Sequence, residues 1–184
     1  AEDMLSKVQV DHLSRKHAPL YAAVSADVLL KTKHYKDAIP FVKIALPNEK
    51  KRENKPRFQY VLAQLYQMDG EREAARNAYQ KVIKMQPSNE MDFNARLRLA
   101  QLEKSPQDGI KLLNKMAKLD KNKDQLDQIY GTIGDVYLAQ KDTVKALEYY
   151  EKAIESSVQH GMAKAKVLVT AGDIYYQQRN YIKA

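Results

Sequence analysis

The residues that could carry chemistry in this sequence are few and scattered. It contains four histidines and no cysteine. His12 and His17 are five residues apart, whereas two zinc ligands on one helix face are four apart. The absence of cysteine excludes disulfides, thiolate metal sites and cysteine nucleophiles. We therefore expect no metal site.

The serines and glycines lack the surroundings that known catalytic and nucleotide-binding motifs require. Ser25, Ser105 and Ser157 do not lie in a nucleophile elbow, and neither a G-x-G-x-x-G motif nor a P-loop occurs. Gly131 and Gly134 are predicted to lie inside a helix, where small residues permit close packing. The sequence therefore predicts no enzyme activity and no cofactor.

The stretch 56–89 shows how the chain is organised. Leu62, Ala63 and Tyr66 fall on one face of a predicted helix. Gly70 is predicted to end this helix in the left-handed conformation that glycine tolerates. A second amphipathic helix follows, with its apolar face formed by Ala75, Ala78, Tyr79, Val82 and Ile83. The stretch is therefore a predicted pair of antiparallel helices.

Similar helix pairs recur along the chain. Each is marked by a small residue in its first helix, namely Ala26, Ala63, Ala100, Gly134 and Gly172. The successive spacings are 37, 37, 34 and 38 residues. The third pair is irregular, because Ala100 and Gly109 are nine residues apart, against twelve from Ala63 to Ala75. We expect its connecting loop to be about three residues shorter than in the pair at 56–89.

This layout resembles the tetratricopeptide repeat (TPR), whose pattern is an aromatic, Leu-Gly and Tyr, followed by Ala, an aromatic and Pro. The stretch 56–89 has Gln59 in place of the aromatic and Ala63 in place of Gly. A closer copy carries Tyr130, Ile133, Gly134, Tyr137, Ala146, Tyr150 and Ala153. The resemblance implies an all-α fold, an α-solenoid of stacked antiparallel helix pairs that forms a right-handed superhelix.

The predicted organisation is a single array over residues 1–184. It consists of a leading helix at 3–16, pairs at 19–50, 56–87, 90–120 and 124–160, and an incomplete pair at 163–184. The sequence stops where the second helix of the last pair would begin, so we expect a fragment of a longer protein. The uncovered end is expected either to fray or to self-associate with another chain.

In stacked helix pairs, the first helices line a concave groove. Counting along these helices places ten candidate partner-binding residues in the groove: Tyr60, Gln64, Gln67, Asn94, Leu97, Gln101, Gln128, Asp135, Lys166 and Asp173. Members of the family that clamp a chaperone's terminal carboxylate place Lys and Asn at such sites, and Tyr60 and Gln64 depart from that. The lining therefore predicts either a site for a partner protein or peptide, or a merely solvated polar surface.

A formal net charge of +8 raises a second function, a helical repeat that binds nucleic acid through basic surfaces. Basic residues gather at 50–57 and at 111–123. The second group recurs at helical spacing opposite Ile110, Leu113 and Ala117, as a solvated face does. No basic motif interleaved with aromatic residues is present, so nucleic acid is the less favoured partner.

The location of the protein depends on a narrower resemblance. No run of about 18 apolar residues and no apolar signal segment occurs in the sequence. The stretches 62–83 and 89–101 resemble the TPR segment of large lipoproteins in gliding-motility and type IX secretion machinery. That resemblance implies a periplasmic, outer-membrane-associated protein with a role in assembly or secretion. Without it, we expect a cytoplasmic location.

Overall fold

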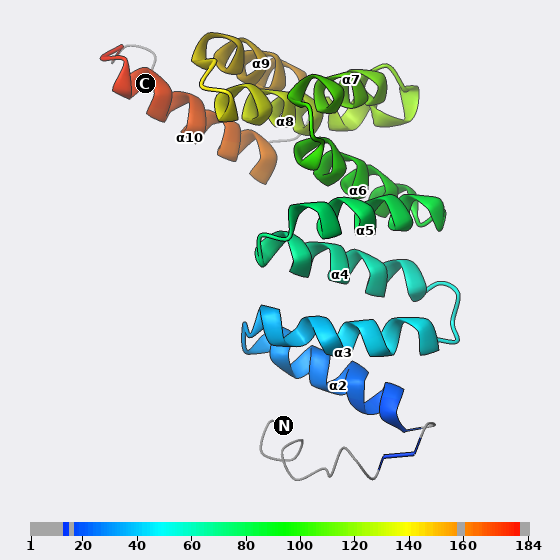
Figure 1. The fold of residues 1–184 in the computed structure, drawn as a ribbon. Helices are drawn as coiled ribbons and strands as arrows, with labels where there is room; N and C mark the ends of the chain where they lie inside the picture. The colour runs from blue at the N-terminus through cyan, green and yellow to red at the C-terminus, as the bar shows by residue number, and fades with distance from the viewer. Residues whose placement is uncertain (1–12, 15–16, 158–160, 181–184) are drawn as a thin grey trace. The chain divides into compact units, whose positions relative to one another are not determined.

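The computed structural model describes residues 13–14, 17–157 and 161–180, and Figure 1 shows their arrangement. The predicted leading helix at 3–16 lies outside the described residues, except for residues 13 and 14. Residues 181–184, where the second helix of the last pair was expected to begin, also lie outside them. The chain forms two units, Ala1–Ala95 and Arg96–Ala184, and their boundary falls inside one helix. Each unit is described by itself.

The first unit contains two complete helix pairs. They are α2 (Ala18–Lys31) with α3 (Tyr35–Asn48), and α4 (Lys55–Met68) with α5 (Arg72–Lys84). Each helix packs against the next one along the chain, and Figure 1 shows them as successive layers. Between the two pairs lies a buried cluster of Ala26, Ala38, Ile39, Val42, Leu62 and Leu65. Helix α6 (Asn89–Leu102) begins in this unit and ends in the second.

The second unit continues with five helical elements. They are α7 (Pro106–Ala117), the 3₁₀ helix η2 (Asp120–Gln125), α8 (Leu126–Ala139), α9 (Thr143–Ser156) and α10 (Met162–Gln177). Helix α7 packs on α8, and α10 packs on both α8 and α9. The fourth pair was expected to begin at 124, but residues 124–125 belong to η2. Within η2, the buried Asn122 donates to the carbonyl of Met116 at 2.8 Å, which satisfies the end of α7.

The fold class predicted from the sequence is confirmed. The described residues contain helices and no strand, and within each unit the helices pack as consecutive antiparallel layers, as in an α-solenoid. The handedness of a superhelix stays a prediction.

The ends of α2, α4, α8 and α10 share one backbone geometry. Each has a residue at positive φ two positions after the last helical residue: Lys33, Gly70, Lys141 and Arg179, respectively. In each turn the next amide donates to the carbonyl five residues earlier, as from Glu71 to Tyr66 at 2.9 Å and from Asp142 to Tyr137 at 3.1 Å. This is the Schellman arrangement. Gly70 was predicted to act in this way, whereas three of the turns hold a lysine or arginine in a conformation that favours glycine.

We therefore expect Lys141→Gly to stabilise the second unit by about 0.5–1 kcal/mol, because a side chain at φ 63° is strained and glycine is not. Chemical denaturation of the variant measures the change. The matched control is the reverse substitution, Gly70→Lys, which should destabilise the first unit by a similar amount. A lower midpoint for Lys141→Gly would contradict this explanation of the turn.

The expectation of a shorter loop in the third pair was wrong. The loops at 69–71 and 103–105 have the same length. The spacing differs because Ala63 lies five residues before the end of α4, whereas Ala100 lies only two before the end of α6. Counted from the helix end, Leu97 rather than Ala100 occupies the place of Ala63. The close approach of α6 and α7 therefore lies beside their turn.

Candidate functional site

In the second unit, the structure brings together two of the residues predicted to line the groove. Lys166 of α10 and Asp135 of α8 form an ion pair, with 2.8 Å between Nζ and Oδ2. These side chains are 66% and 27% exposed, respectively, so the pair lies at the surface with Asp135 partly sheltered. The first helices of two successive pairs thus place their predicted groove positions side by side.

The carboxylate of Asp135 also accepts a hydrogen bond from Tyr150 of α9. The Tyr150 ring is fully buried, and its hydroxyl donates to Asp135 Oδ1 at 2.9 Å. Burial raises the pKa of Tyr150 well above its usual value, and the negative charge and hydrogen bond of Asp135 raise it further. The hydroxyl therefore stays protonated and donates, which fixes the orientation of the carboxylate toward Lys166.

The remaining predicted positions of this surface differ in exposure. Gln128 is half-buried, and its carbonyl accepts from Thr132 Oγ1 at 2.7 Å. On α10, Asp173 is exposed, as is its neighbour Val169 at 65%. Gly131 of α8 faces α10, where a Cβ would stand 3.0 Å from a methyl of Val167. Helices α8 and α10 are thus closely packed at this point.

In the first unit, two of the predicted positions contact the buried ring of Tyr79. The ring of Tyr60 meets it edge-on, with centroids 5.5 Å apart, and Tyr79 Oη donates to Gln67 Oε1 at 3.0 Å. Gln64 is exposed, while Tyr60, Gln67 and Asn94 are half-buried. Tyr60 therefore offers one part of its ring to solvent and packs the other part on the core.

The predicted positions on the second-unit part of α6 are less open. Leu97 is buried, with 9% of its surface exposed, and Gln101 is half-buried. Leu97 occupies the position equivalent to the buried Ala63 of α4, so it has little exposed surface to offer a partner. Arg98 is exposed and stands where Gln64 stands on α4, counted from the helix ends. Arg98 was not predicted as a groove position, because the positions on this helix were counted with Ala100, rather than Leu97, as the equivalent of Ala63.

The described residues were also compared with what a metal site, a membrane span and a basic nucleic-acid surface require. Among them, no group of three or more His, Asp or Glu is placed to hold a metal ion. None of the described helices combines the length and apolar character needed to cross a membrane. Basic side chains of the 111–123 group have acidic neighbours, as in the pairs Lys111–Asp108 at 3.4 Å and Lys123–Asp120 at 2.9 Å.

Comparison with known proteins points to one family. A family model described as tetratricopeptide repeat matches residues 3–166. No match to the sequence was found among the curated proteins. The crystal structure of BtubC from P. vanneervenii is similar, with a TM-score of 0.60 and 18% identity over 89% of this chain and 74% of that chain.

Two further structures are similar at the same level. MamA from Desulfovibrio magneticus RS-1 has a TM-score of 0.60 and 17% identity, over 89% of this chain and 87% of that chain. YrrB, described as a TPR protein with an unusual peptide-binding site, has a TM-score of 0.59 and 19% identity, over 83% of this chain and 75% of that chain. At these identities the similarity shows the fold alone.

Proposed function

The chain belongs to the tetratricopeptide repeat family, and from that premise we propose that it is a non-enzymatic scaffold that binds a partner protein or peptide. The proposed surface is the set of predicted groove positions on the first helices. The observation that carries the proposal is the ion pair between Asp135 and Lys166. This ion pair joins one predicted position of α8 to one of α10, two successive first helices of the second unit.

Such a surface suits a bound polypeptide for physical reasons. Each helix pair presents side chains at a regular spacing, so a partner segment can meet several of them in turn. In the second unit the surface offers an acid, a base and the exposed Asp173 and Val169. In the first unit it offers the exposed amide of Gln64 and the half-buried ring of Tyr60. Amides can bond a peptide backbone, and an aromatic ring supplies contact area at small entropic cost.

We expect the double variant Tyr60→Ala with Gln64→Ala to weaken partner binding by about 1–2 kcal/mol, because aromatic side chains often dominate such interfaces. A partner is first isolated by affinity capture with the whole chain, and its binding segment is then titrated by calorimetry. Circular dichroism checks that the variant keeps its helices. In the second unit, Val169→Ala with Asp173→Ala is the corresponding variant.

The control for both is Lys111→Ala with Lys115→Ala, which removes two exposed charges from α7. This variant should bind the partner as the unaltered chain does. If it weakens binding while the groove variants do not, the outer surface is the binding site.

The rival function, nucleic-acid binding, has less support from the described contacts. Lysines of the 111–123 group already face Asp108 and Asp120, which lowers the net positive potential there. A salt titration against a generic oligonucleotide separates the two functions. Micromolar affinity that falls steeply with salt would favour nucleic acid.

Two finer proposals concern the setting of the scaffold. The resemblance of 62–83 and 89–101 to secretion lipoproteins suggests a partner from a secretion or envelope assembly, and a periplasmic location. Cell fractionation tests this location. Self-association through the last repeat stays a prediction. The apolar side chains of α10 that would serve it are Leu168, Val169 and Tyr176, with 47%, 65% and 65% of their surface exposed.

A further inference from the structure

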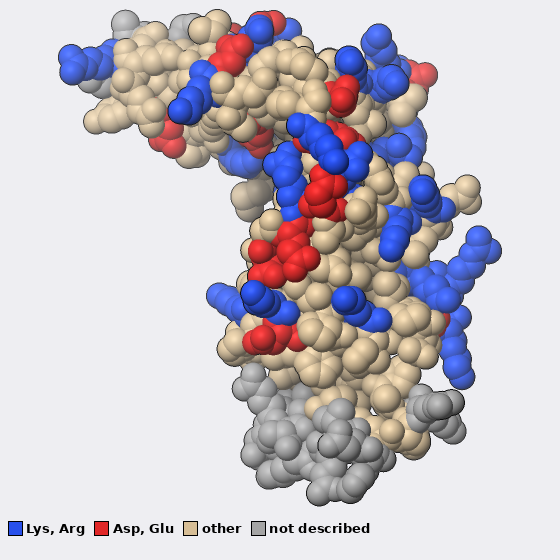
Figure 2. Space-filling model, in the orientation of Figure 1, with Lys and Arg blue, Asp and Glu red and all other residues tan. Residues whose placement is uncertain are grey.

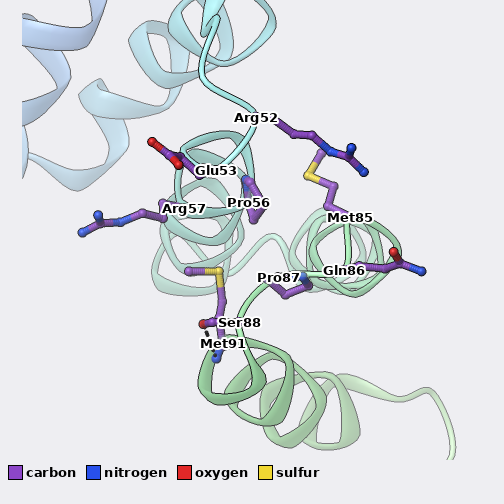
Figure 3. Close-up of a pocket in the computed structure, with 9 residues that line it drawn as sticks. All are labelled: Arg52, Glu53, Pro56, Arg57, Met85, Gln86, Pro87, Ser88 and Met91. Atoms are coloured by element: carbon purple, nitrogen blue, oxygen red, sulfur yellow. Dashed lines mark hydrogen bonds between the residues drawn. The ribbon is translucent and has the colours of Figure 1, made fainter.

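The first unit has a pocket at the helix ends, formed by residues outside the predicted groove positions. It lies between the start of α4 and the turn from α5 to α6, with a volume of about 570 Å³. Figure 3 shows Pro56 of α4 next to Pro87 of the turn, with the side chains of Met85 and Met91 on either side. We call this the Met–Pro pocket. Its volume falls within the range of about 300–1,000 Å³ that is usual for ligand sites.

The Met–Pro pocket has four apolar side chains in its lining, and two of them are methionines. Pro56 is buried, and Met85, Pro87 and Met91 are half-buried, so part of each of these three faces the opening. Methionine is unbranched and polarizable, and it fits itself to apolar groups of different shapes. The pocket can therefore take a large aliphatic or aromatic side chain.

The rim of the Met–Pro pocket is basic. Arg52 and Arg57 line it, and Figure 3 shows their guanidinium groups extending outward on opposite sides. Within residues 49–57 there are five lysines and arginines against Glu49 and Glu53, which gives 5 − 2 = +3. Figure 2 shows blue side chains gathered at this edge of the first unit, beside the connection from α3 to α4.

The two arginines are available to a partner. Both are exposed, and in the described part of the chain neither is paired with a carboxylate. Glu49 is already engaged, because its carboxylate accepts from the Lys51 amide at 2.8 Å and from Asn54 Nδ2 at 3.2 Å. These hydrogen bonds, the Lys51 amide's foremost, hold the pKa of Glu49 below its usual value.

We propose that the Met–Pro pocket binds an acidic peptide segment of a partner protein. An apolar side chain of the segment enters between Met85 and Met91, and flanking carboxylates pair with Arg52 and Arg57. Guanidinium groups suit this role because they bind carboxylates through two parallel hydrogen bonds. The site goes beyond the groove, so failure of either proposal leaves the other standing.

The lining favours a peptide over a nucleic acid. None of the residues lining the pocket is aromatic, so bases would find no ring to stack on. Glu53 also lies on the rim, where its charge opposes a phosphate backbone. A peptide can place its carboxylates toward the arginines and away from Glu53.

The test uses the whole chain and a short fluorescein-labelled peptide with acidic residues on both sides of a central Phe. Fluorescence anisotropy should show saturable binding that weakens as salt rises. The variant Arg52→Ala with Arg57→Ala should weaken it about five- to tenfold. Met85→Gln keeps the length of the side chain but makes it polar, and it should weaken binding about threefold or more. The groove variant Tyr60→Ala with Gln64→Ala should bind the peptide unchanged.

Three further probes can overturn the proposal. A peptide with Ser in place of the Phe should bind at least about fivefold more weakly; equal binding would show simple charge attraction without a pocket. A peptide with Lys in place of the acids should not bind. A labelled oligothymidine that binds more tightly than the acidic peptide, and loses affinity with the two arginines, would make this a nucleic-acid site.

Discussion

Gly134→Leu is expected to lower the free energy of unfolding by at least about 3 kcal/mol, at the upper end of the effect of overpacking a core. A Cβ at position 134 would lie within about 2.5 Å of the ring of Tyr150. That ring is fully buried, and its hydroxyl is bonded to Asp135, so it cannot turn aside without loss. Helices α8 and α9 would have to separate. Thermal and chemical denaturation measure the effect.

The control in the same unit is Gly161→Ser. A Cβ at position 161 meets nothing within 4 Å, and the residue is the N-cap of α10, where serine is favoured. This variant should unfold at the same midpoint or slightly higher. Combining Gly134→Leu with Tyr150→Ala should cost much less than the sum of the two, because the truncated ring makes room for the leucine. An unchanged midpoint for Gly134→Leu alone would show that the helices yield freely at this crossing.

The helix pairs could be predicted because their signals are local. Small residues such as Ala63 and Gly134, followed at fixed spacing by Tyr79 and Tyr150, mark where two helices cross. The structure has all four residues buried. Gly70 signalled the end of α4 by its type alone. The equivalent turns at Lys33 and Lys141 carry no such signal, because lysine is not a residue type that favours the left-handed region.

Local signals of this kind could not predict which residues of α6 face the neighbouring helices. Buried residues stand at Phe93, Ala95, Leu97, Leu99 and Ala100. They surround the helix rather than follow one stripe, so no single face can be derived from their spacing. Both Ala95 and Ala100 fit a small-residue position, and the sequence offers no reason to choose between them. The position of Leu97, and with it that of Arg98, followed only from the three-dimensional structure.

Both sites depend on contacts between residues far apart in the sequence, so these contacts could not be predicted, although Asp135 and Lys166 were each predicted to line the groove. Asp135 and Lys166 are 31 residues apart, and their ion pair depends on α10 packing against α8. The Met–Pro pocket needs the turn at Pro87 to stand opposite the start of α4. The basic stretch at 50–57 was visible from the sequence, but its apolar neighbours were not.

Gly109→Val is expected to be as costly as Gly134→Leu for a different reason, with a loss of at least about 3 kcal/mol. A Cβ at position 109 would overlap the carbonyl oxygen of Ala100 and lie 3.2 Å from its carbonyl carbon. These are backbone atoms near the end of α6, so no side chain can rotate to make room. Helices α6 and α7 would have to move apart beside their three-residue loop.

Two comparisons separate this clash from other effects of a valine in α7. Gln107→Val places the same side chain at an exposed position of the same helix, so it reports the lower helix propensity of valine alone, about 0.5 kcal/mol. Ala100→Gly removes the side chain at the crossing but leaves its carbonyl in place. Combined with Gly109→Val, it should therefore give no rescue, in contrast to the rescue of Gly134→Leu by truncation of Tyr150. If Ala100→Gly restores the midpoint of Gly109→Val, the clash is with a side chain, and the close backbone approach of α6 and α7 is wrong.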